Sequence, residues 1–141
     1  MRRALKCRAK SLGLAVLLLT LSTACDAMHR TRIIVPPPAA GVANAAGSER
    51  VLSEARAVLV EQAFTKETAA HRALVEYWSW RDPAKPPGVR VGLVTSRDGV
   101  VVAIAQDLMG PIGRTEKYDA LVTAVVSRLT ACVGSENVRV E

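Results

Sequence analysis

The stretch that decides the fold runs from Val89 to Gln106 and reads VRVGLVT, SRDG, VVVAIAQ. Its two outer arms are rich in β-branched residues, which favour strands. Asp98-Gly99 lies between the arms, and a glycine tolerates the positive φ that a tight turn requires. The pattern therefore predicts a β-hairpin with strands over Val89–Thr95 and Val100–Gln106.

Helical periodicity lies on both sides of this hairpin. Towards the N-terminus, apolar residues recur at three- and four-residue spacing after Ser48, which predicts a helix over 49–63 with Ser48 as its N-cap. Towards the C-terminus, Thr115 is the predicted cap of a last helix and Gly134 its predicted end. The apolar face predicted for that helix consists of Tyr118, Leu121, Val122, Val125, Leu129 and Cys132. Residues 137–141 alternate like a short strand.

An aromatic cluster lies in the segment 73–80, ALVEYWSW. Its spacing fits a helix, whereas its aromatic density favours a strand, and we expect a strand over the second half. On a strand, Trp78 and Trp80 share one face and Tyr77 takes the other. The three side chains then either fill the core or form an outward surface for a partner, and the sequence leaves both open.

The order of these elements predicts the fold class. We expect α-β-β-β-α-β, a small two-layer α+β sandwich in which two helices pack on an antiparallel sheet of three to four strands. The predicted domain is 48–141.

The first 24 residues have the pattern of an export signal. Residues 1–10 hold five cations and no acid, and the apolar run LGLAVLLLTL follows over 12–21. Small residues at 22–24 then precede Cys25. A charged start, a short apolar region and small residues at the cut are typical of a secretory signal peptide. The apolar run is about half of the roughly 20 residues that a spanning helix needs.

The sequence Leu21-Ser22-Thr23-Ala24-Cys25 resembles the lipobox of bacterial lipoproteins. The resemblance covers the N-terminal 25 residues, and Ser22 stands where the commonest pattern has leucine. It implies cleavage before Cys25, lipid on the Cys25 sulfur and a periplasm-facing protein of the bacterial envelope. Asp26 resembles the signal that retains such proteins in the inner membrane rather than the outer. An ordinary signal peptide, cut after Ala24, is the alternative.

Removal of residues 1–24 changes the charge of the chain. The full sequence has 19 Lys and Arg against 13 Asp and Glu, whereas 14 cations remain after cleavage. Nucleic-acid binding depends on clustered cations, so a nearly neutral exported chain argues against that partner.

Residues 25–47 are predicted to be a lipidated cysteine and a tether rich in Pro, Ala and Gly. Fully extended, residues 26–47 would reach roughly 60–70 Å. The short run Ile33-Ile34-Val35 within it fits either a strand or a contact with the lipid surface.

Standard catalytic and metal-binding spacings are absent from the sequence, and no cofactor is expected. One loop, Gly110-Pro-Ile-Gly113-Arg114-Thr115, leads into the last helix, and its free N–H groups together with Arg114 could hold an anion. Nearby Asp107 could act there as an acid or base. A plain strand-to-helix connection explains the same residues.

The sequence thus favours a non-enzymatic envelope lipoprotein that binds or scaffolds an envelope protein or a cell-wall component. The alternative is a small-ligand binder or enzyme that uses the Gly110–Thr115 loop with Asp107.

Overall fold

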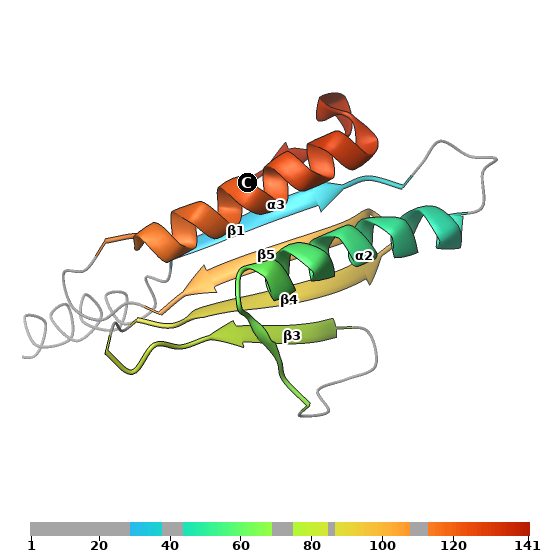
Figure 1. Cartoon of the computed structure of the whole chain (residues 1–141). Coiled ribbons are helices and arrows are strands. Elements are labelled where there is room, and N and C mark those ends of the chain that lie inside the picture. The colour runs from blue at the N-terminus through green and yellow to red at the C-terminus, as the bar shows by residue number, and fades with distance from the viewer. Residues whose placement is uncertain (1–28, 38–43, 69–74, 85–86, 108–112) are drawn as a thin grey trace, which may run out of the picture.

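Six strands of the described residues form one antiparallel sheet with the order β2-β3-β4-β5-β1-β6 (Figure 1). The computed structural model describes residues 29–37, 44–68, 75–84, 87–107 and 113–141. In chain order the elements are β1 (His29–Val35), α2 (Asn44–Glu61), β2 (Thr65–Lys66), β3 (Val75–Trp80), β4 (Val89–Ser96), β5 (Gly99–Gln106), α3 (Glu116–Val133), the 3-10 helix η1 (Ser135–Asn137) and β6 (Arg139–Val140).

The predicted hairpin is confirmed as β4 and β5, which pair from Val89 opposite Gln106 to Ser96 opposite Gly99. Gly99 has a φ of 111°, and a Cβ placed on it would lie 2.0 Å from the carbonyl oxygen of Val35. Only glycine fits this turn, because the backbone of β1 passes directly against it.

The sheet has six strands, so the predicted three to four are too few, and the largest difference is β1. Its residues belong to the segment that the sequence assigned to a tether, yet they pair with β5 along the whole strand. Ile33 and Val35 reach the core, whereas Arg30 and Arg32 lie on the opposite side. Pro36 has no N–H to continue the ladder. The folded unit therefore takes in part of the expected tether.

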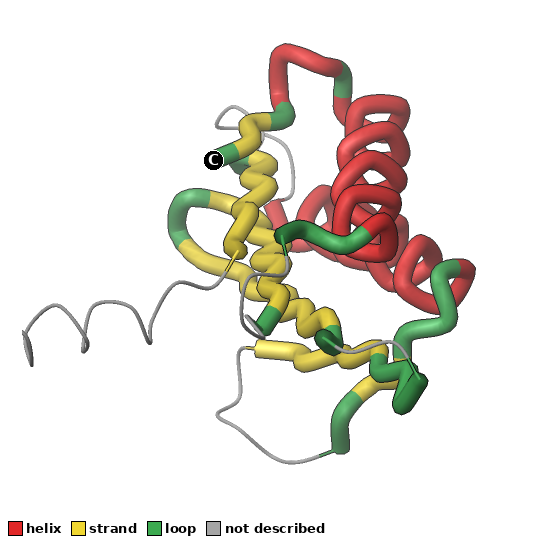
Figure 2. Tube along the Cα trace, turned by 90° about the vertical axis from the view of Figure 1, so that its left-hand side faces the viewer, coloured by secondary structure: helices red, strands yellow, loops and turns green. Residues whose placement is uncertain are grey.

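Both described helices lie on the same face of the sheet (Figures 1 and 2). Between them and the strands lies one hydrophobic core, made of Ile33, Val35, Val51, Ala55, Val58, Leu59, Phe64, Trp78, Val89, Val91, Leu93, Val100, Val102, Ile104, Tyr118, Leu121, Val125 and Leu129. The hydroxyl of Tyr118 is 2.6 Å from that of Thr31, which joins α3 to β1. Two layers around one core make this an α+β fold.

The helix ends differ in how well the sequence predicts them. Thr115 caps α3 as expected, since its hydroxyl accepts from the backbone N–H of Tyr118 at 3.2 Å, and Gly134 ends the helix. By contrast, α2 begins at Asn44, so Ser48 lies inside the helix and is not its cap. Alanine at 45 and 46 favours helix, so α2 begins before the predicted cap, Ser48.

Candidate functional site

The face of the sheet opposite the two helices carries no described helix (Figure 2), and we call it the open face. Because strand residues alternate between faces, the pairing register assigns its members. They form three rows across the strands: Arg30, Ala105, Arg90 and Ser79; Arg32, Ala103, Gly92 and Tyr77; and Ile34, Val101 and Val94.

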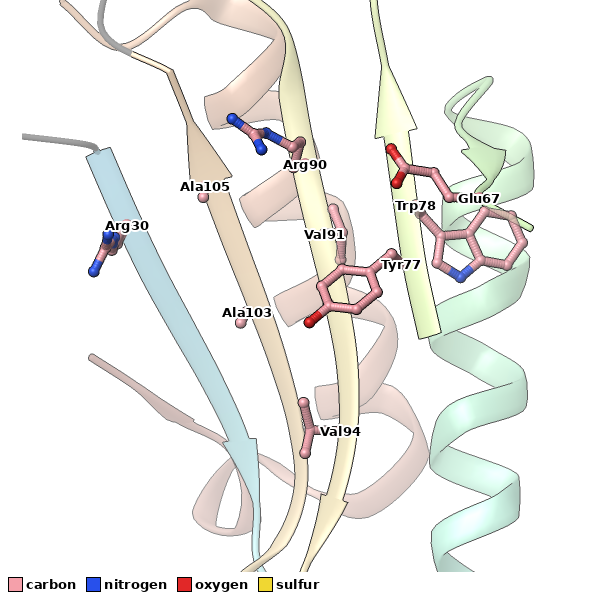
Figure 3. Close-up of a pocket in the computed structure, with 10 residues that line it drawn as sticks. Arg30, Glu67, Tyr77, Trp78, Arg90, Val91, Val94, Ala103 and Ala105 are labelled. Carbon is pink, nitrogen blue, oxygen red and sulfur yellow. The ribbon is translucent and has the colours of Figure 1, made fainter. Parts of the chain in front are cut away.

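A hollow of about 500 Å³ lies on this face. Its floor consists of Gly92, Ala103 and Ala105, whose small side chains leave room above the strands. Tyr77 and Arg90 line it on one side and Arg30 on the other (Figure 3).

Tyr77 is the most exposed large hydrophobic residue of the described open face. Its residue is 39% exposed, whereas Val101, in the centre of the same face, is 8% exposed. Gly92 pairs directly opposite Tyr77, and the tyrosine ring extends across β4 in Figure 3. An exposed aromatic ring beside an apolar depression is typical of a surface that receives a partner's side chain.

The charges of the open face gather around the hollow. Arg30 and Arg90 stand in one row with Ala105 between them, about 10 Å apart by the spacing of strands. Arg90 donates to Asp107 at 2.5 Å, in a pair that is about half exposed on the arginine side. Glu67 lines the hollow at the opposite edge, where its backbone N–H donates to the carbonyl of Tyr77 at 2.8 Å.

The structure separates the three aromatic residues that the sequence grouped. Trp78 is buried in the core, and Trp80 packs partly buried against it, so the two tryptophans share one face as predicted. Tyr77 lies on the other face, also as predicted. Of the three residues that the sequence offers as a possible surface for a partner, Tyr77 is therefore the one that a partner can reach on the open face.

Lys117 occupies the space between the core and the end of α2. Its Nζ donates to the carbonyl of Gln62 at 2.5 Å and lies 5.4 Å from the ring centre of Phe64 and 5.2 Å from that of Trp80. Burial lowers the pKa of this amine, because the charged form loses water. Its contacts hold α2, α3 and β3 together, a structural role that needs no ligand.

The loop that the sequence nominated for anion binding is held by Gln106, which is fully buried. The Gln106 amide donates to the carbonyl of Gly113 at 3.0 Å, and its oxygen accepts from the Thr115 backbone N–H at 2.9 Å and hydroxyl at 2.8 Å. Arg114 pairs with Asp119 at 3.4 Å. These donors serve the fold, and Gly110 lies outside the described residues.

Asp107, the predicted acid or base of that loop, joins Arg90 rather than the loop donors. In the sequence, Gln106 is the one polar residue of the run VVVAIAQ, and this is the signal that points to it. For the hollow, the signal is the small residues Gly92, Ala103 and Ala105, which alternate with larger ones along the hairpin.

No protein-family model matches this chain, and no curated protein matches it. Among the described residues, no helix is both long and apolar enough to cross a membrane. The described part of the chain contains no group of three or more His, Cys, Asp or Glu that could hold a metal ion. Cys25 and Asp26 lie outside the described residues. The site is thus characterised by its own geometry, an apolar hollow with guanidinium groups at one end.

Proposed function

We propose that this chain is an envelope lipoprotein, anchored through lipid on Cys25, whose α+β domain binds a segment of another envelope protein on the open face. The observation that carries the proposal is the hollow of about 500 Å³ on a sheet face that no described helix covers. A face of this kind, with an exposed tyrosine and guanidinium groups at its rim, is suited to recognition rather than to bond making.

The chemistry of the hollow favours a protein segment over a cell-wall glycan. Its floor of glycine and alanine offers no side-chain donors or acceptors, so the hydroxyls of a sugar would lose water there without new hydrogen bonds. An apolar side chain loses nothing on the same floor. Arg30 and Arg90 place positive charge at one end, and although Arg90 also donates to Asp107, this charge favours a segment with an acidic group.

The anchor is supported by the lipobox resemblance at 21–25 and by the export pattern before it. A lipoprotein carries two or three acyl chains, and at about 0.8 kcal/mol per buried methylene two chains hold a protein stably at a bilayer. Asp26 supports the inner membrane, with the domain facing the periplasm.

Labelling with radioactive palmitate tests the anchor. The wild type should carry label, and Cys25→Ser should carry none, with Cys132→Ser as the matched control that keeps the label. Equal labelling of the wild type and Cys25→Ser would contradict lipidation at Cys25.

Site-specific photo-crosslinking in cells tests the docking face. A photoreactive amino acid at Ala103, on the open face, should give an adduct whose partner, identified by mass spectrometry, is an envelope protein. The control position is Ala131, which is exposed on α3 away from the open face. The adduct should weaken with Arg30→Glu and persist with Arg97→Glu, which makes the same charge change on the exposed hairpin turn. Adducts of equal yield from Ala103 and Ala131, or insensitivity to Arg30→Glu, would contradict the proposal.

A further inference from the structure

The start of β1 at His29 limits how far the domain can stand from a lipid anchor. Three residues separate Cys25 from His29. Consecutive Cα atoms are about 3.8 Å apart, so the two residues lie at most about 15 Å from each other. A fully extended tether over 26–47 would reach roughly 60–70 Å. That reach is lost, because β1 takes up residues 29–35 of the segment.

The register shows which end of the domain the anchor holds. His29 pairs with Gln106, and the same end of the sheet contains the start of β4 at Val89 and the end of β3 at Trp80. We call this the anchor end. The distal end contains Val35 and the hairpin turn Ser96–Gly99, about 20 Å away along the six steps of β1 (Figure 1).

The two ends of the hollow differ in chemistry along the direction from the anchor end to the distal end. Its row of arginines, Arg30 and Arg90, is the row nearest the anchor end, whereas Val94 lies towards the distal end. With lipid on Cys25 as proposed, the basic end of the hollow would be the end nearer the anchor, and the apolar end would be the end farther from it.

From this geometry we propose that the open face binds a membrane-bound protein, at a segment within about 35 Å of the bilayer surface, with an acidic group of that segment at its membrane-proximal end. The proposal rests on the lipid anchor of the proposed function. It limits where the contacted segment lies, because a segment farther from the bilayer than the summed length of the linker and the strand is out of reach.

A second copy of this chain fits the open face poorly. Two copies anchored in one membrane would both have their anchor ends at the bilayer. If their open faces paired about a two-fold axis along the membrane normal, each row of one copy would face the same row of the other. Arg30 and Arg90 of one copy would then oppose the same arginines of the other, and like charges placed opposite one another are unfavourable.

A lipid surface fits it poorly as well. The apolar floor consists of Gly92, Ala103 and Ala105, whose side chains are too short to protrude, whereas insertion into lipid requires apolar side chains that protrude. Tyr77 is the one strongly exposed large hydrophobic residue of the described open face. A concave floor receives a protein side chain better than a flat bilayer.

Spin labels test the height of the domain directly. The lipidated protein, in a Cys132→Ser background, is placed in phosphatidylcholine vesicles that contain a nickel-chelating lipid, and one label is attached at Gly113→Cys or at Arg97→Cys. Both positions are exposed, and they lie at the anchor and distal ends respectively. We expect nickel to relax the label at position 113 several-fold more than the label at 97. Equal relaxation at the two positions would overturn the proposed orientation.

The crosslink from Ala103 tests the partner class. A Gly/Ser insertion of 20 residues after Met28 adds a root-mean-square reach of about 25 Å without touching the sheet. We expect it to lower the adduct yield several-fold, because a longer flexible linker dilutes the domain around its partner. The same 20 residues added after Glu141 should leave the yield unchanged.

The outcomes separate the two proposals. Adducts with a membrane protein that weaken with the insertion after Met28, and not with the insertion after Glu141, support the inference. Unchanged adducts, or adducts with a glycan, with lipid or with a second copy, overturn it, while palmitate on Cys25 keeps the anchor in place. Absence of palmitate from Cys25 in the wild type overturns the anchor and this inference together.

Discussion

Substitution of Ile33 by alanine distinguishes a strand of the core from a tether. Ile33 is fully buried in the centre of β1, between β5 and β6, and its side chain contributes to the core beneath α3. Truncation of a buried isoleucine to alanine costs 2–5 kcal/mol, depending on how far the cavity collapses. Ile33 pairs with Val102, itself fully buried, so little collapse is expected and we predict a cost of about 3 kcal/mol.

The matched control is Ile34→Ala, one residue along the same strand. Ile34 is half-buried on the open face, and its truncation should cost about 1 kcal/mol or less. The free energy of unfolding is measured by urea titration of the mature protein, with tryptophan fluorescence as the signal, since Trp78 lies in the same core. For a domain of this size, 3 kcal/mol corresponds to a fall in Tm of about 12–24 °C. Equal costs below about 0.5 kcal/mol at both positions would refute the placement of β1 in the sheet.

Three further predictions concern the turn, the loop and the ion pairs. Gly99→Ala should destabilise the domain by more than about 2 kcal/mol, because a φ of 111° is strained for alanine and the added Cβ would meet the backbone of β1. Gly113→Ala is the control and should change stability little, because no atom lies within 4 Å of the added Cβ. Similar thermal shifts in the two variants would contradict this prediction. Gln106→Leu should cost about 3 kcal/mol by urea titration, since three hydrogen bonds are lost at about 1 kcal/mol each, and a cost under about 0.5 kcal/mol would refute the role of the amide. Hydrogen bonds from Arg56 lower the pKa of Glu76. This carboxylate therefore stabilises the fold above its unfolded pKa of about 4.3, and the contribution is lost as pH falls through the lower folded pKa. Glu76→Gln should make the free energy of unfolding fall less steeply at acid pH, and an unchanged fall would contradict the assignment.

The parts of the fold that the sequence predicts are those specified by neighbouring residues. The hairpin follows from Asp98-Gly99 between two β-rich arms, and the cap of α3 follows from Thr115. Strand alternation alone also places Tyr77 on the face opposite Trp78. Each of these features is decided within a few residues, so local propensity and periodicity are sufficient.

The parts that the sequence does not predict depend on pairing between distant residues. β1 contributes two fully buried apolar side chains, among cations and before prolines, and its partner β5 lies about 70 residues later in the chain. Arg30 and Arg90 belong to one row solely because both pair with Ala105. No local pattern contains that register, which is why the sequence offers Tyr77 as a possible contact and yet does not predict the hollow or its arginines.

The strand order gives β1 a role that an edge strand could not fill. β1 lies between β5 and β6, and it pairs with β5 along its whole length and with β6 at Ile33 and Ile34. A lipid at Cys25 would therefore hold the whole sheet through a ladder of seven residues with β5, and displacement of the anchor would displace the hollow with it. Since β1 also supplies Arg30, the same strand connects the proposed anchor, the core and the site. If Cys25 carries lipid as proposed, a partner bound on the open face lies within the reach set by three residues and the length of the strand, which is shorter than the reach of an extended tether over 26–47.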